Sequence, residues 1–173
     1  MLEGLESMMR GDIMSRHKAE TVLIKKGDKE RYDVVKLWRM IHLLPVMAKV
    51  IERVILNKMV KEVDLEDTQY ASRKNRSTHD MFKQIYEFVD YNKNMNCGML
   101  SMDVAGGFDK VDIGILCRIL EERGCSEGLK KWVKRWTRNR SIRLRFNRRM
   151  TRDYDLNKGV PQGSPLSSFL FRI

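Results

Sequence analysis

The sequence is poor in cysteine, in proline and in long apolar runs, and each shortage excludes a class of protein. Its three cysteines are odd in number and form no CxxC pair, so neither a disulfide framework nor a zinc site is expected, and a reducing compartment fits. The longest apolar run, near positions 43–48, is too short to cross a bilayer, and positions 1–14 carry acidic residues and no secretory apolar core. We therefore expect an intracellular protein that does not enter a membrane.

Acidic residues are also scarce relative to basic ones. The 173 residues include 23 Asp and Glu against 34 Lys and Arg, which gives a formal net charge of +11. The hydrophobic content of 42% indicates a single folded domain, or one compact part of a larger one. The positive excess favours a polyanionic partner, nucleic acid first; a merely soluble basic protein is the alternative.

The positive charge is concentrated in one segment. Positions 129–152 contain eleven basic residues and no acidic one, which equals the net charge of the whole chain. Within this segment, positions 141–146 alternate apolar and basic side chains, as a half-buried strand does, and a turn at 147–149 leads to a return strand near 154–156. Arginines spaced along a strand suit a phosphate backbone. The candidate nucleic-acid contacts are Lys130, Lys134, Arg138, Arg143, Arg145 and Arg148.

Apolar spacing and capping residues predict the helices. Pro45 opens a helix to about Val63 whose apolar residues recur at helical spacing, while Lys49 and Glu52 fall on its surface. His42, just before it, has no partner at metal-ligand spacing and is predicted to be packed. Positions 19–24 read as a strand followed by a basic turn. Further helix starts are predicted at Ser77 or Thr78, with Asp80 in the first turn, at Asp112, with Gly124 ending that helix, and at Ser126.

One stretch combines an apolar strand pattern with two carboxylates and a glycine pair. Positions 97–103 are predicted to form a strand that ends in Asp103, followed by Gly106, Gly107, Phe108 and Asp109. An aspartate delivered by a strand end can hold a metal ion at a rigid edge, and glycines permit close approach of another molecule. A buried strand followed by an ordinary turn is the alternative.

Two other polar stretches admit both a functional and a structural interpretation. Arg73, Lys74 and Arg76 precede a helix start and could form an anion cradle, or simply a solvated loop. Ser164 and Pro165 give a hydroxyl cap followed by proline at a helix start, which is a structural device in its own right.

Taken together, these stretches resemble the reverse transcriptases of non-LTR (LINE-type) retrotransposons, from about position 19 to the end. Positions 38–44 are similar to the family's YRPISLL, 48–53 to AKVLER, 69–78 to QYGFRKGRST and 102–111 to LDVKGAFDNV. Positions 159–167 reproduce GVPQGSPLS without a change. Group II intron maturases share the fold, but the motifs at positions 69–78 and 159–167 fit LINE-type elements better.

The resemblance implies roles for several residues. Asp103, with the Val104 carbonyl beside it, would hold the two catalytic Mg²⁺ ions, and Phe108 would exclude a 2′-hydroxyl and select deoxynucleotides. Lys49 and Arg73, with Arg39, would grip the triphosphate of the incoming nucleotide. Gln162 and Gly163 would form the floor under the nascent base pair. The implied partners are an RNA template, a DNA primer and deoxynucleoside triphosphates, in the nucleus.

The sequence also departs from the family pattern. Met40 and His42 replace proline and serine, residues 71 and 72 replace glycine and phenylalanine, and Gly107 replaces alanine. The family's second carboxylate motif, aromatic-Ala-Asp-Asp, and its thumb are not in these residues. Because Mg²⁺ needs at least two well-placed anionic ligands beside substrate phosphates, we expect that this chain alone does not polymerise. A catalytically inactive, nucleic-acid-binding remnant is therefore the alternative to a polymerase segment.

The expected architecture is α+β, with right-hand polymerase fingers and an incomplete palm, rich in helix with a small antiparallel sheet. Residues 1–96 would be the fingers-like region, and residues 97–173 the partial palm, with its missing C-terminal part and thumb outside the sequence. An incomplete palm predicts an unpaired sheet edge, exposed apolar surface and aggregation.

Overall fold

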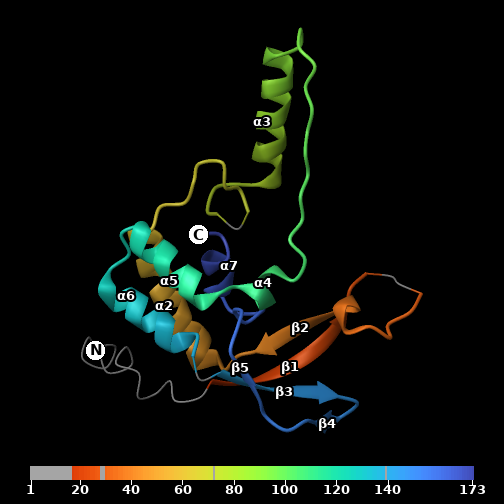
Figure 1. Cartoon of the computed structure of the whole chain (residues 1–173), viewed down its shortest axis with the longest axis vertical. Coiled ribbons are helices and arrows are strands. Elements are labelled where there is room, and N and C mark those ends of the chain that lie inside the picture. Colours follow the sequence, from red (N-terminus) through yellow and green to blue (C-terminus); the bar gives the residue numbers. More distant parts are fainter. Residues whose placement is uncertain (1–16, 28–29, 72, 139) are drawn as a thin grey trace.

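A small sheet lies beside a layer of helices, and one helix projects away from both (Figure 1). The computed structural model describes residues 17–27, 30–71, 73–138 and 140–173. Two details of the sequence predictions, position 72 and the tip of the basic turn at 28–29, fall outside the described residues.

Within the described residues the sheet has five strands, and it is mixed because β1 pairs antiparallel with β2 but parallel with β3. The expectation of an antiparallel sheet is therefore wrong in part. A parallel neighbour is possible here because more than a hundred residues, including the helical layer, separate β1 from β3 along the chain. The strands are β1 (His17–Lys25), β2 (Trp38–Leu43), β3 (Arg140–Phe146), β4 (Arg149–Met150) and β5 (Tyr154–Leu156), which pairs with β3 as the predicted return strand.

The helical layer contains the main core. Side chains such as Ile55, Leu120, Val133 and Phe169 are almost fully buried and contact one another across four helices. The sheet and the core both combine residues from either side of position 96. The helices of this layer are α2 (Val46–Glu62), α5 (Ile113–Glu122), α6 (Glu127–Trp136) and the short α7 (Ser167–Leu170).

The helix starts predicted at Ser77, Asp112 and Ser126 are confirmed, whereas the helix expected to begin at Ser164 and Pro165 begins at Ser167. Ser77 caps α3 (Thr78–Tyr91) in a reciprocal capping box with Asp80, and Asp112 accepts from the Ile115 N–H at the start of α5. Gly124, with φ +72°, follows the end of α5. Ser126 precedes α6 without a side-chain cap bond. Two short helical turns complete the described elements: η1 (Val35–Leu37) and α4 (Gly107–Lys110).

The predicted strand at 97–103 is wrong. This segment is extended and runs back along α3 toward α4, but it pairs with no strand among the described residues (Figure 1). An apolar, extended sequence becomes a strand only where another strand supplies partners for its backbone groups. As a result its apolar side chains are open to solvent, with exposed fractions of 78% for Met99, 82% for Leu100 and 84% for Met102.

Helix α3 also buries no side chain fully, although one of its faces is apolar. The expectation of exposed apolar surface in residues 97–173 is thus confirmed for the extended segment, while the exposed apolar face of α3 lies outside that expectation. In the part of the chain that the structure describes, no helix combines the length and the apolarity needed to cross a bilayer.

Candidate functional site

Backbone hydrogen bonds join two of the motifs that sequence analysis singled out. The Val160 N–H donates to the Phe108 carbonyl at 2.8 Å, and the Gly159 N–H donates to the Val111 carbonyl at 3.0 Å. These bonds tie the turn around α4, which follows Asp103, to the loop 159–164. On the other side of this loop, the His42 N–H donates to the Gln162 carbonyl at 2.8 Å. The loop is therefore held between the α4 turn and the end of β2.

Three glycines make these close approaches possible. A Cβ on Gly159 would lie 2.7 Å from the carbonyl oxygens of Phe108 and Asp109, and one on Gly163 would lie 2.6 Å from the His42 carbonyl oxygen. A Cβ on Gly107 would lie 2.5 Å from the Phe171 ring. Gly159 and Gly163 also have positive φ angles, which glycine adopts most readily.

Phe108 and Gln162 are both partly buried, beside this junction. The Phe108 ring stacks on Phe171, with ring centroids 5.0 Å apart, and packs against the edge of the main core. Gln162 has its backbone fixed by His42, and its side chain is half-buried. Fixed backbones with partly accessible side chains are what a rigid binding surface requires.

Asp103 is exposed at the end of the extended segment, and it has no hydrogen-bond or ion-pair partner among the described residues. Val104 lies nearer the body of the molecule, in a pocket shared with α5 and Phe171. No group of three or more His, Cys, Asp or Glu side chains that could hold a metal ion occurs within the described ranges. One exposed carboxylate and one carbonyl do not make a complete Mg²⁺ site.

The three residues expected to grip a triphosphate lie on three different elements. Arg39 is exposed on β2, opposite Ile24 of β1. Lys49 is half-buried in the first turn of α2. Arg73 is half-buried in the loop before α3, where it donates to the Glu66 carbonyl at 2.7 Å.

Arg73 lies near a second arginine that sequence analysis did not single out. Arg172 donates to the Ala71 carbonyl at 2.8 Å, and both arginines line one pocket beside α2. Burial, and then the charge of Arg73, lowers the pKa of Arg172. The charge of Arg73 is partly neutralised by Asp67, whose Oδ1 lies 3.6 Å from the Arg73 Nη2.

His42 is packed, as predicted. It is buried at the end of β2, and its Nδ1 lies 2.9 Å from the Thr21 hydroxyl on β1. Burial lowers the pKa of His42, the charge of Arg140 lowers it further, and Asp109 acts in the opposite direction. The ring is therefore neutral in the folded chain near pH 7.

Two charged residues that sequence analysis placed on the surface are buried. Glu52 is 1% exposed and Arg140 5% exposed, against expectations of a helix surface and a basic face. The signal that could have placed Glu52 is its spacing, since it lies four residues after Ala48 and three before Ile55, both buried on α2. Burial raises the pKa of Glu52, while Ser164, Trp136, Lys49 and Arg140 lower it. Burial lowers the pKa of Arg140 to about 10, against the charge of Glu52.

Several of the basic candidates for nucleic-acid contact are paired with acidic residues, some on other elements and one on the same helix. Arg143 contacts Asp153, and Arg145 contacts Glu20. The Lys130 Nζ lies 2.9 Å from Oε2 of Glu127 and 3.4 Å from Oε1 of Glu121. Arg148 is exposed at the tip of the β3–β4 turn, where its φ is +61°.

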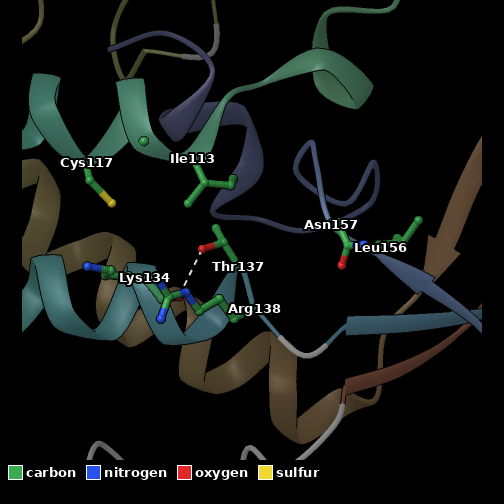
Figure 2. A pocket seen from close by; sticks show the side chains of 8 residues that line it. Ile113, Cys117, Lys134, Thr137, Arg138, Leu156 and Asn157 are labelled. Atoms are coloured by element: carbon green, nitrogen blue, oxygen red, sulfur yellow. Dashed lines mark hydrogen bonds between the residues drawn. The ribbon is translucent and has the colours of Figure 1, made fainter.

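Lys134 and Arg138 lie at a separate place, around a pocket between α5, α6 and β5 (Figure 2). Cys117 and Ile113 face the same pocket from α5, and Asn157 borders it just after β5. The basic segment therefore presents two surfaces, one on α6 and one at the hairpin tip, and Arg140 belongs to neither.

Comparison of the sequence with known proteins identifies the family of the chain. The family model described as "Reverse transcriptase (RNA-dependent DNA polymerase)" matches residues 24–173. The chain is 26% identical over 154 residues to a "Retrovirus-related Pol polyprotein from type-1 retrotransposable element R2" of Popillia japonica, which covers 87% of this chain and 21% of that protein. It is 27% identical over 159 residues to a "Probable RNA-directed DNA polymerase from transposon X-element" of Drosophila melanogaster, with 87% and 17% covered.

The chain thus spans about a fifth of these relatives' length. The region that matches is the one that carries the α4 turn, the loop 159–164 and the basic segment. The chain belongs to the reverse transcriptase (RNA-dependent DNA polymerase) family, and its relatives are polymerases of non-LTR retrotransposons.

Proposed function

We propose that this chain supplies the nucleotide-binding and template-binding part of an RNA-directed DNA polymerase, which transfers deoxynucleotides to a primer 3′-hydroxyl on an RNA template. The observation that carries the proposal is the junction between the α4 turn and the loop 159–164. Its hydrogen bonds and its glycines hold Phe108 and Gln162 on rigid, adjoining backbone. Within this proposal, the sheet with β1 and β2 corresponds to fingers, and the α4 turn with α5–α7 corresponds to part of a palm.

Each side chain has a role that fits its surroundings. Phe108 would set the space available at the sugar, and Gln162 and Gly163 would lie beneath the base pair. Lys49, Arg39 and Arg73 would bind phosphate oxygens as fixed positive charges. The exposed tip of the β3–β4 hairpin, with Arg148, and the α6 surface with Lys134 and Arg138 would contact the backbone of template or primer.

The chain would supply only some of the ligands of the catalytic Mg²⁺ ions. Mg²⁺ in this family aligns the primer hydroxyl with the α-phosphate, and Asp103 with the Val104 carbonyl would be its ligands. Those two groups alone do not complete such a site. We propose that the remaining carboxylates lie outside the 173 residues, that the complete polymerase acts in the nucleus, and that these residues alone bind without polymerising.

Equilibrium binding of nucleotides tests the proposal. The chain should bind dATP in the presence of Mg²⁺ more tightly than ATP, because the Phe108 ring leaves no space for a 2′-hydroxyl. Phe108→Ala should reduce this preference several-fold while leaving dATP binding measurable. Equal affinities for dATP and ATP in the wild-type chain would contradict the assigned role of Phe108, and no binding of either would contradict the nucleotide site.

A further inference from the structure

Glu52 connects three segments that are far apart in the sequence. Its Oε1 accepts a hydrogen bond from the Trp136 indole N–H at 2.8 Å, and its Oε2 accepts one from the Ser164 hydroxyl at 2.6 Å. Glu52 is 1% exposed, so bulk solvent has almost no access to these bonds. The carboxylate therefore fixes the end of the loop 159–164 to α2 and α6.

The Ser164 hydroxyl has no capacity left for any other arrangement. Its oxygen accepts from the Leu166 N–H at 3.1 Å and from the Ser167 N–H at 3.2 Å, while its proton goes to Glu52. A hydroxyl has one proton and two lone pairs, so all three positions are used. Glu52 must consequently accept at both of its oxygens, which an ionised carboxylate does and an amide cannot.

Arg140 holds the opposite end of the same loop. Its Nη2 donates to the Gly159 carbonyl at 2.5 Å, and its Nε donates to the Thr137 carbonyl at 3.2 Å. Arg140 is buried and carries the charge opposite to that of Glu52, and the two side chains line one internal cavity behind Pro161. Each charge thereby reduces the cost of burying the other.

We propose that Glu52 is a positioning residue, which with Arg140 clamps the two ends of the loop 159–164 and so sets the orientation of Gln162 and Gly163. A contact between these two residues and a nucleotide rests on the proposed function. The clamp itself is independent of the proposed function. Neither Glu52 nor Arg140 touches the nucleotide site directly. Their effect passes through Ser164 at one end and through the Gly159 carbonyl at the other.

The first test removes one acceptor without changing the side chain's size. In Glu52→Gln, the amide can face either Ser164 or Trp136 with its oxygen, but the other donor then meets an N–H group. Amide hydrogen exchange by NMR should show faster exchange at Leu166 and Ser167, by about tenfold or more, as loss of a hydrogen bond to a charged group produces. Amides paired between β1 and β2 should keep their wild-type exchange.

A rescue variant separates positioning from general destabilisation. In Glu52→Gln with Trp136→Phe, the indole donor is gone, so the amide oxygen is free to accept from Ser164. Exchange at Leu166 and Ser167 should return toward the wild-type rate, although the double variant loses more packing than the single one. If the double variant exchanges faster than Glu52→Gln at these amides, the clamp is overturned.

Ser164→Ala keeps the proposal testable if the Glu52 variants do not fold, because it removes one hydroxyl and adds no volume. It should raise exchange at Leu166 and Ser167 as Glu52→Gln does, and wild-type exchange there would also overturn the clamp. Binding of dATP with Mg²⁺ is the second readout, and both single variants should weaken it about tenfold. If the wild-type chain binds no dATP while the exchange pattern is as expected, the clamp stands and the proposed function fails.

Discussion

At the scale of single residues, the loop 159–164 owes its position to contacts that tolerate no extra atom. Gly163 combines a φ of +120° with a close approach to the His42 carbonyl, and Gly159 makes a similar approach to the α4 turn. Because the neighbouring atoms are backbone, they cannot move aside as a flexible side chain would. The loop's shape is therefore set by the absence of side chains at two positions.

Gly163→Ala should destabilise the chain by about 1–3 kcal/mol, through backbone strain and the 2.6 Å contact with the His42 carbonyl oxygen. Gly128→Ala is the matched control, since no atom lies within 4 Å of its Cβ position in α6. That substitution should stabilise the chain by about 0.5–1 kcal/mol, because alanine favours helix. Urea denaturation measures both changes, and a Gly163→Ala chain as stable as wild type would contradict the contact.

His42 should make the chain sensitive to mild acid. Its folded pKa is lowered from 6.5, mainly by burial and then by Arg140, so the unfolded chain binds this proton more readily than the folded chain does. Stability should therefore fall as the pH drops below 6.5. In His42→Gln, this part of the pH dependence should be absent from a series of denaturation curves, and an unchanged slope would count against the assignment.

Sequence alone identified the residue types at this junction but not its buried charges. Ser164 was expected to cap the last helix, and its hydroxyl does accept from the Leu166 and Ser167 N–H groups. Glu52 and Arg140 were placed on surfaces, because charged residues are rarely buried without a partner and their partners are distant in sequence. Only the folded chain brings those partners together.

At the scale of helices and strands, local signals predicted most of the elements. Capping residues and apolar spacing located α2, α3, α5 and α6, and alternation located β3. The parallel pairing of β1 with β3 was missed, because no local pattern encodes which distant strand is the neighbour. The segment 97–103 was misassigned for a related reason: its composition suits a strand, but strand formation depends on a partner.

The cap of α3 should matter locally rather than globally. Ser77→Ala removes the hydroxyl that accepts from the Asp80 N–H, while the backbone N–H of residue 77 can still donate to the Asp80 carboxylate. Loss of this half of the capping box should cost about 1 kcal/mol of helix stability, seen as faster amide exchange in the first turn of α3. Ser126→Ala is the control, because the Ser126 side chain makes no cap bond to α6. Equal effects of the two substitutions on their helices would show that the Ser77 cap contributes nothing specific.

At the scale of the whole molecule, α3 and the extended segment carry some of the most exposed apolar side chains, such as Tyr86, Leu100 and Met102. Helix α3 and the segment 96–105 project from the body of the molecule and lie side by side along a shallow apolar groove, which Phe88 and Met99 help to line (Figure 1). Exposed apolar surface of this kind promotes association between molecules. The remainder of the molecule has a conventional core and a basic exterior.

We expect the chain to self-associate through this region. Leu100→Lys, at a side chain 82% exposed, should reduce association in analytical ultracentrifugation without lowering the melting temperature. Val35→Lys is the control, because Val35 is 73% exposed on η1, which is not part of α3 or of the segment 96–105. A wild-type chain that sediments as a monomer at high concentration would show that the region does not mediate association.

The α4 turn and the loop 159–164 together should form a nucleotide site. Photoaffinity labelling with an azido derivative of dATP, mapped by mass spectrometry, would locate that site on the chain. We expect label within residues 104–111 and 159–164, displaced by unlabelled dATP. Label found only on other segments, such as the pocket around Lys134 and Arg138, would contradict it.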